Sequence, residues 1–380
     1  SMSSTWSWRE SREPLHISLA AGTLTLSFDG MANLSFDGEG RLVGAWYEGQ
    51  TYRRTLDNRI LLKWTDSRSH TRRARRFLSR HESDQLIERT YGDAERILAA
   101  LVSGNFDTTG TDDETVDTIS SWLASVMQWD TKRLDQDAAR FRAIYKPVSI
   151  LPPDQYLSVV LQATEGCSYN ECSFCTFYRD RKFRIKPVSE FADHVEDVSE
   201  FLGRGMFMRR SIFLADANAI VVPQSRLLPL LYIVNRRFDF SDSRRKDDAA
   251  VNLEPGQWTP TGIHAFVSAP DALRKTSDDI RELSRQHVKR LYIGLETGHD
   301  PLREFLRKPG NSEQALQAVK TIKAGGIEVA IIVMVGVGGQ QFRNAHLHDT
   351  VEIIKRMPLG RGDLVYVSPF VPAPESPYLD

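Results

Sequence analysis

The chain has 380 residues, of which 41% are hydrophobic and 26% charged, and its formal net charge is −1. These values are ordinary for a globular protein, and the balanced charge creates no overall field that would favour nucleic acid or an anionic membrane. No run approaches the ~20 apolar residues that span a bilayer, and the first residues lack the pattern of a signal peptide. Three cysteines in one short segment make a poor disulfide framework. The sequence therefore predicts a cytoplasmic protein without a membrane span and long enough for two domains.

Residues 1–150 are predicted to form a smaller α+β accessory domain. Between residues 15 and 64, apolar and polar side chains alternate, and Asp-Gly pairs separate the alternating runs. This pattern is typical of antiparallel hairpins, so a small β-meander is expected. Residues 83–105 and 112–145 then show apolar positions at helical spacing, with Asp112 and Asp113 as candidate N-caps.

Residues 151–380 are predicted to form the larger domain. Six short apolar strands alternate with helical stretches, which is typical of a parallel sheet with right-handed crossovers. The expected fold is α/β, a partial (β/α)6 TIM-like barrel whose chemistry gathers at the carboxyl ends of the strands. The charged, turn-rich stretch 241–260 is expected to be an insertion or a mobile loop. The expected strands are 157–163, 211–214, 263–267, 291–295, 329–335 and 364–367, and the expected helices are 188–203, 225–237, 271–286, 301–306, 312–325 and 345–356.

The three cysteines of the chain, Cys167, Cys172 and Cys175, lie in one loop after the first strand of the expected barrel. Three thiolates at this spacing can hold one inorganic centre and leave one coordination position open. Structural zinc is the alternative, but such a site is closed by four ligands, and the nearest downstream histidine, His194, falls inside the next expected helix. A 4Fe–4S cluster with one iron not bound by the protein is the best fit.

The run Gly-Cys-Ser-Tyr-Asn-Glu-Cys-Ser-Phe-Cys that contains these cysteines resembles the cluster loop of the radical S-adenosylmethionine (SAM) superfamily. The usual spacing there is Cys-x3-Cys-x2-Cys. Here four residues separate Cys167 from Cys172, as in a branch similar to the Elongator catalytic subunit, the methylthiotransferases and the oxygen-independent coproporphyrinogen oxidase. The resemblance implies one 4Fe–4S cluster whose fourth iron is bound by SAM. It also implies that Phe174 packs on the adenine, with simple loop packing as the alternative.

The resemblance extends over residues 155–380 and assigns further SAM contacts at the strand ends. Asp216, together with Asn218, ends the second strand and would accept from the SAM amino group, whereas a helix cap is the alternative role. Ser268 ends the third strand, where a small polar residue would touch SAM.

The fourth and fifth strands end in motifs of the same kind. Glu296, in a Gly-Leu-Glu-Thr-Gly element, is expected to face the barrel mouth and to accept from the ribose hydroxyls or the methionine ammonium. Arg307 or Lys308 would suit the SAM carboxylate by charge, and a solvated helix end is the alternative. Val335 and Gly336 resemble the strand edge that contacts adenine, and no P-loop lysine follows them.

By this resemblance the chain is an enzyme that cleaves SAM reductively at the cluster, and the resulting 5′-deoxyadenosyl radical abstracts hydrogen from a substrate C–H bond. An external one-electron reductant of the flavodoxin or ferredoxin type would supply the electron. With no fourth cysteine, a second cluster and a methyl-cysteine are not expected. Six arginines in residues 68–80 suit anions, so an anionic metabolite, lipid or cofactor precursor is the expected substrate. The same segment leaves open an RNA-binding or RNA-modifying protein of the same fold, or a solvated basic loop.

Overall fold

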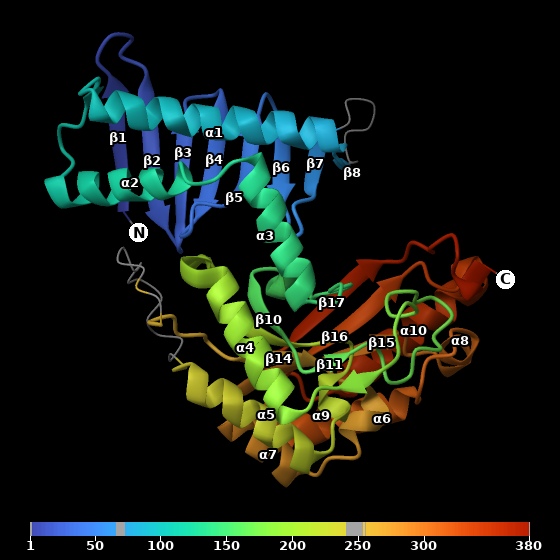
Figure 1. Cartoon of the computed structure of the whole chain (residues 1–380). Coiled ribbons are helices and arrows are strands. Elements are labelled where there is room, and N and C mark those ends of the chain that lie inside the picture. Colours follow the sequence, from blue (N-terminus) through green and yellow to red (C-terminus); the bar gives the residue numbers. More distant parts are fainter. Residues whose placement is uncertain (1, 66–72, 241–253, 255, 380) are drawn as a thin grey trace. The chain divides into compact units, whose positions relative to one another are not determined.

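The computed structural model describes residues 2–65, 73–240, 254 and 256–379 (Figure 1). Most of the predicted insertion 241–260 therefore lies outside the described residues. The chain forms two compact units. The first comprises Ser1–Tyr145, Asp197–Arg209 and Ser243–Trp258, and the second comprises Lys146–Glu196, Arg210–Asp242 and Thr259–Asp380. Because two later stretches are counted with the first unit, the division into an accessory domain and a barrel domain at residue 150 stays a prediction.

The first unit is built on a nine-stranded antiparallel sheet in the order β8-β7-β6-β5-β4-β3-β2-β1-β9. Strands that follow one another in the chain are neighbours from β1 to β8, which is the meander that the alternating pattern predicts. The sheet is larger than expected, because it begins at Met2 rather than near residue 15. Its strands are β1 (Met2–Trp8), β2 (Pro14–Ala20), β3 (Thr23–Phe28), β4 (Ala32–Asp37), β5 (Leu42–Tyr47), β6 (Gln50–Arg54), β7 (Ile60–Thr65), β8 (Arg73–Phe77) and β9 (Phe106–Asp107).

Helices α1 (Arg80–Val102), α2 (Asp113–Val126) and α3 (Thr131–Ile144) complete this unit, and Figure 1 shows α1 and α2 across one face of the sheet. The side chain of Asp112 caps α2, as predicted, by accepting from the Thr115 amide at 2.8 Å. The expected single stretch 112–145 is broken after α2. The reason is a second cap, because Asp130 accepts from the Arg133 amide at 2.8 Å and starts a new helix.

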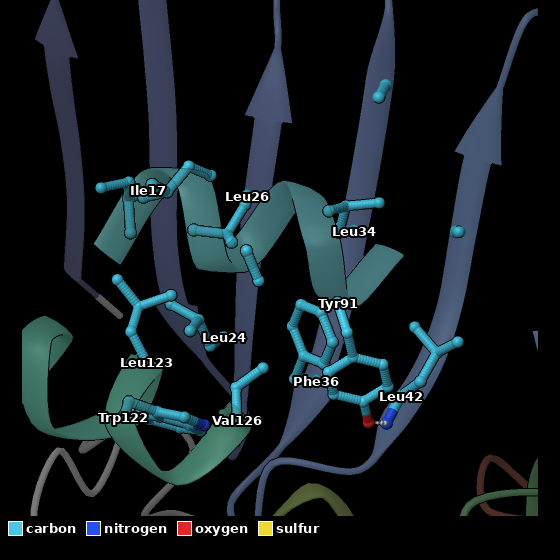
Figure 2. Packing of buried hydrophobic residues seen from close by; sticks show 14 of the residues in the cluster. Ile17, Leu24, Leu26, Leu34, Phe36, Leu42, Tyr91, Trp122, Leu123 and Val126 are labelled. Carbon is cyan, nitrogen blue, oxygen red and sulfur yellow. Dashed lines mark hydrogen bonds between the residues drawn. The ribbon is translucent and has the colours of Figure 1, made fainter. Parts of the chain in front are cut away.

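The core of the first unit lies between the sheet and these helices (Figure 2). Alternate residues such as Leu24, Leu26 and Leu34 point from the strands toward α1 and α2, because side chains on a strand alternate between its two faces. Tyr91 of α1 is buried there, and its hydroxyl accepts from the Leu42 amide at 2.9 Å. The helix layer is thus joined to the sheet by a polar contact as well as by apolar packing.

The second unit is built on a six-stranded sheet in the order β10-β13-β14-β15-β16-β17, in which every neighbouring pair is parallel. This confirms the expected α/β class with a parallel sheet, while curvature into a partial barrel stays a prediction. All five residues of β13 are buried, as expected for a strand covered on both faces. The strands are β10 (Ser158–Gln162), β13 (Ser211–Ala215), β14 (Ile263–Phe266), β15 (Val288–Glu296), β16 (Glu328–Val335) and β17 (Leu364–Pro369), with a separate pair of β11 (Thr164–Glu165) and β12 (Arg184–Ile185).

The helices of this stretch of chain follow the predicted order, with two differences. The expected helix 271–286 is two helices, because Thr276 and Asp279 form a capping box that starts a new helix. The last helix begins earlier than residue 345, directly after Gly338, whose φ is +80°. In the described part of the chain, no helix is long and apolar enough to cross a membrane. The helices are α4 (Val188–Leu202), α5 (Gln224–Arg237), α6 (Ala269–Ala272), α7 (Ser277–Arg285), α8 (Asp300–Phe305), α9 (Ser312–Ala324) and α10 (Gly339–Arg356).

Candidate functional site

The parallel sheet brings the predicted site residues to one edge. All six strands run in the same direction, so their carboxyl ends meet along that edge. The cysteine loop follows β10 and β11, Asp216 follows β13 directly, and Ser268 follows β14 after one intervening residue. Glu296 and Val335 are the last residues of β15 and β16, and Gly336 comes next. The residues that the sequence predicts at strand ends therefore also lie at or next to strand ends in the structure.

The three cysteines are partly buried free thiols. Burial raises the pKa of Cys172 to about 11 and also raises the pKa of Cys175. Thiols in such surroundings become good ligands only when a metal centre stabilises the thiolate. Among the described residues, no three His, Cys, Asp or Glu side chains gather closely enough to hold a single ion. With three cysteines in one loop and no fourth cysteine in the sequence, the donor set fits a cluster with one iron left open better than a closed four-ligand zinc site.

The middle of the cysteine loop is held through the backbone of Ser173. Its amide donates to the carbonyl of Leu306 at 2.9 Å, and its carbonyl accepts from the Ser376 hydroxyl at 2.5 Å and from the Tyr378 amide at 2.9 Å. The Ser173 hydroxyl is buried and has no partner among the described residues. An unpartnered buried donor in this position fits a loop that holds a further group.

Asp216 anchors the start of the cysteine loop. Its carboxylate accepts from the Gly166 amide at 2.7 Å and from the Gln162 side chain at 3.1 Å, and Arg181 lies 3.6 Å away. Burial raises the pKa of Asp216 to about 6, although these partners oppose the shift. Both carboxylate oxygens are thus engaged next to Cys167. A contact with the SAM amino group stays a prediction.

Asn218 and Ser268 share a partner that the sequence analysis missed, Asp271. The Asn218 amide group donates to Asp271 at 2.6 Å and to the hydroxyl of Ser168 in the cysteine loop at 3.4 Å. Ser268 is the N-cap of α6, because its side chain accepts from the Asp271 amide at 3.3 Å. Ser-x-x-Asp is a capping pattern, and this signal could have identified Asp271. The three residues connect the ends of β13 and β14 to the cysteine loop.

Glu296 has an unusual backbone conformation for a residue with a side chain, with φ at +61°. The pairing of β15 with β16 shifts register between Gly294 and Glu296, and such irregularities re-aim a side chain at the end of a strand. The carboxylate is buried, which raises the pKa of Glu296, while Lys308 opposes the shift. A buried carboxylate in a sparsely populated backbone conformation is typical of a functional position.

Lys308, rather than Arg307, lies beside this carboxylate. The Lys308 ammonium is 3.6 Å from a Glu296 oxygen and 5.8 Å from the centre of the Phe174 ring. Arg307 has an exposed side chain, and its backbone carbonyl accepts from the Tyr169 hydroxyl at 2.9 Å. The structure therefore joins Phe174 of the cysteine loop, Lys308 and Glu296 in one group, and it places the Arg307 side chain outside that group.

The loop after β16 is open. The side chain of Val335 is 51% exposed. Gly336 has φ at +84°, which a residue with a side chain rarely adopts. Apart from its two chain neighbours, no described residue has an atom within 4 Å of the place where a Cβ would be. The space beside Gly336 is thus free for a ligand to approach the backbone.

Helix α10 supports the ends of β15 and β16 in a way that no sequence pattern indicated. His346 is buried, and its Nε2 lies 2.7 Å from the Met334 carbonyl, so this nitrogen must carry the proton. The other ring nitrogen, Nδ1, lies 2.6 Å from the Thr297 hydroxyl. A Cβ on Gly298 would lie 2.6 Å from the backbone of α10, so only glycine permits this close approach. These contacts hold the turn that follows Glu296.

Comparison with known proteins places part of this site in a family. Residues 233–351 match the model of the Radical SAM superfamily. This segment thus resembles the radical SAM superfamily. The match includes Ser268, Glu296, Arg307, Val335 and Gly336 and begins after the cysteine loop. It confirms the superfamily resemblance for this part of the sequence, and a superfamily of this kind implies an enzyme with two cofactors, a 4Fe–4S cluster and SAM.

No curated protein matches the chain. Among solved structures, the cobalamin-dependent SAM radical enzyme OxsB is 16% identical with a TM-score of 0.39, over 58% of this chain and 28% of that chain. The radical SAM methyltransferase TsrM from Kitasatospora setae is 14% identical with a TM-score of 0.42, over 62% and 42%. Coproporphyrinogen III oxidase (HemN) from Escherichia coli is 12% identical with a TM-score of 0.40, over 64% and 48%. The chain spans less than a third of the length of OxsB. Because these TM-scores are low, the similarity to the three structures does not extend what the family match shows.

Proposed function

We propose that the protein is a radical SAM enzyme that cleaves SAM reductively and uses the product to abstract hydrogen from a substrate C–H bond. The observation that carries this proposal is the meeting of the cysteine loop with Glu296, Lys308 and Phe174 at the carboxyl edge of the parallel sheet. When bound, the cluster and SAM together supply a 5′-deoxyadenosyl radical. The protein residues bind and orient these groups and the substrate.

The proposed ligands of the cluster are the thiolates of Cys167, Cys172 and Cys175. They leave one iron for SAM, as the resemblance implies. The positive charge of Lys308 lies beside the buried Cys172, where it lowers the pKa of that thiol against the effect of burial. The same ammonium neutralises Glu296 in the absence of a ligand. Lys308 can therefore give up its interaction with Glu296 or with Cys172 when a charged ligand binds.

The proposed SAM site extends from the cysteine loop along the strand ends. Phe174 offers an aromatic face, Glu296 an acceptor for ribose hydroxyls or an ammonium, and Lys308 a cation for a carboxylate. Gly336 leaves space for a flat ring beside the backbone. Glu296 and Lys308 carry opposite charges and already face one another. Binding of the zwitterionic methionine part of SAM would replace this one ion pair by two, one of Glu296 with the ammonium and one of Lys308 with the carboxylate.

The larger domain is proposed to be a partial (β/α)6 barrel, with residues 1–150 as an accessory domain. The all-parallel order of the six strands supports the first part of this proposal. The substrate is proposed to be a small or lipid-like anionic molecule, and the electron donor a flavodoxin or ferredoxin, in a cytoplasmic setting.

No observation favours the RNA alternative in the described part of the arginine segment. Arg76 forms an ion pair with Glu82 at 2.7 Å, and Arg80 forms one with Asp84 at 3.1 Å. The segment contributes β8, an edge strand of the first sheet. Charged side chains on an edge strand prevent association with other strands, so these arginines have a structural explanation. Residues 66–72 lie outside the described part.

The test is anaerobic reconstitution with iron and sulfide, followed by incubation with SAM and dithionite. We expect about four irons per chain and release of 5′-deoxyadenosine, measured by chromatography. The variant Cys175→Ala should fold, because its thiol is only partly buried, but it should release no 5′-deoxyadenosine. Ser121→Ala, at an exposed serine of α2, is the control and should behave as the wild type. SAM cleavage by Cys175→Ala at the wild-type rate would contradict the proposed function.

A further inference from the structure

Ser173 carries a buried hydroxyl for which the described protein offers no partner. The residue is 4% exposed and stands between Cys172 and Phe174, in the middle of the proposed cluster loop. No hydrogen-bond partner lies near its Oγ among the described residues. Burying a hydroxyl without a hydrogen-bond partner is unfavourable, so most buried hydroxyls in folded proteins have a partner.

The backbone of Ser173 is fixed from two directions, so the position of its Cβ is set and only rotation about χ1 remains to the hydroxyl. Its amide is held by the carbonyl of Leu306, just after α8. Its carbonyl is held by the Ser376 hydroxyl and the Tyr378 amide, and Ser376 itself is buried. Both backbone groups therefore have partners, whereas the hydroxyl has none in the part of the chain that the structure describes.

The chemistry of the loop indicates what the missing partner is. A serine hydroxyl can rotate and donate one proton, and the sulfur atoms of an iron–sulfur cluster accept hydrogen bonds that tune the reduction potential. Cys172 precedes Ser173 directly, and the Cys175 amide donates to the Cys172 carbonyl at 3.3 Å, so the loop turns tightly around this position. A cluster held by the three thiols would thus place sulfur close to Ser173.

We propose that the Ser173 hydroxyl donates a hydrogen bond to a sulfur atom of the cluster and thereby raises its reduction potential. The proposal rests on the proposed function, since it needs the cluster to bind. A hydrogen bond stabilises the more negative, reduced cluster more than the oxidised one, because the sulfurs of the reduced cluster carry more charge. Ser173 then acts as a positioning residue for the loop through its backbone and tunes the cluster through its side chain.

The experiment measures the midpoint potential of the reconstituted full chain by redox titration, followed by electron paramagnetic resonance of the reduced cluster. In Ser173→Ala, the equilibrium should shift roughly threefold toward the oxidised form, which corresponds to about 28 mV at 59 mV per tenfold change. Iron content should stay at the wild-type value. Ser121→Ala, at an exposed serine of α2, is the control and should leave the potential unchanged. Electron–nuclear double resonance in H2O and D2O should show one exchangeable proton fewer for Ser173→Ala.

The outcomes separate this inference from the proposed function. A wild-type chain that binds no cluster would overturn both. A wild-type chain that binds a cluster, together with equal potentials for the wild type and Ser173→Ala, would overturn only the role of the hydroxyl and indicate water as its partner. If Ser173→Ala binds less iron than the wild type, the potential of Ser173→Thr is measured as well, because threonine keeps the hydroxyl. A wild-type potential in Ser173→Thr supports the hydrogen bond, and a potential like that of Ser173→Ala contradicts it.

Discussion

The two units differ in how far their buried polar groups are satisfied by the protein itself. In the first unit, Arg41 is buried at the turn between β4 and β5 and pairs with Asp37 at 3.3 Å and Asp137 at 2.9 Å. It also donates to the carbonyls of Phe201 and Leu202. At the carboxyl edge of the second unit, the Glu296–Lys308 distance is 3.6 Å, and the Ser173 hydroxyl has no partner in the described part of the chain.

This difference shows how to separate structural polar groups from functional ones. A buried charge is tolerated when several partners surround it, and removing one partner is then very costly. Groups that must bind a ligand need free hydrogen-bonding capacity, which the fold has to tolerate in the absence of the ligand. The first cluster therefore supports the fold, and the second is suited to binding. Substitutions in the two clusters should affect different measurements.

The largest effect on stability is expected for Arg41→Ala. It leaves two buried carboxylates without their cation, so the free energy of unfolding should fall by about 3–5 kcal/mol, measured by urea denaturation. Iron content per folded chain should not change. Arg59→Ala is the control, because Arg59 also pairs with an aspartate but its side chain is 61% exposed. Such surface pairs contribute about 0–1 kcal/mol, and an equally small loss for Arg41→Ala would contradict the comparison.

The next effect is a pH dependence at Asp216. Burial raises its pKa from the ordinary 3.8 to about 6, so the folded protein binds this proton more tightly than the unfolded chain. The resulting stability is present at low pH and is lost as the pH rises through about 6. The free energy of unfolding of the wild type, minus that of Asp216→Asn, should therefore fall by about 1.3 kcal/mol between pH 5 and 7. A flat difference across this range would show that Asp216 titrates at an ordinary pKa.

The smallest effect is expected for Tyr378→Phe. The Tyr378 hydroxyl accepts from the Gly338 amide at 2.9 Å, and its ring packs on Phe370 and Phe305. The variant keeps the packing but removes the acceptor, at a cost of about 1 kcal/mol. Because the same segment holds the cysteine loop, SAM affinity should weaken up to about fivefold, measured by calorimetry.

Tyr366→Phe is the matched control for this prediction. The Tyr366 hydroxyl donates to Asp154 at 2.7 Å, so the variant also loses one hydrogen bond to a phenol. It should cost similar stability and leave SAM affinity unchanged. A weakening of SAM binding in both variants to the same extent would indicate a general effect on the unit rather than a link between Tyr378 and the cofactor site.

Much of the site could be predicted because its signals are local in sequence. The spacing of Cys167, Cys172 and Cys175 and the apolar strands that end at Asp216 and Glu296 are patterns within a few residues. The direction of the strands then brings these positions together, because the carboxyl ends of parallel strands meet at one edge. The capping signals at Asp112 and Asp130 are equally local, although the predicted stretch 112–145 treats α2 and α3 as one helix.

The contacts between distant segments were decided by the tertiary structure alone. Sequence offered Arg307 and Lys308 as equal candidates, and the backbone turn at Arg307, with φ at +52°, leaves Lys308 beside Glu296. The contact between Ser173 and Ser376 joins residues 203 positions apart, and no periodicity or spacing reports such a pair. The sequence by itself thus determined the parallel sheet and the motifs that carry the resemblance to the superfamily and its two cofactors. Folding decided which cation faces the carboxylate and which hydroxyl has no partner among the described residues, because both depend on the packing of segments that are remote in the chain.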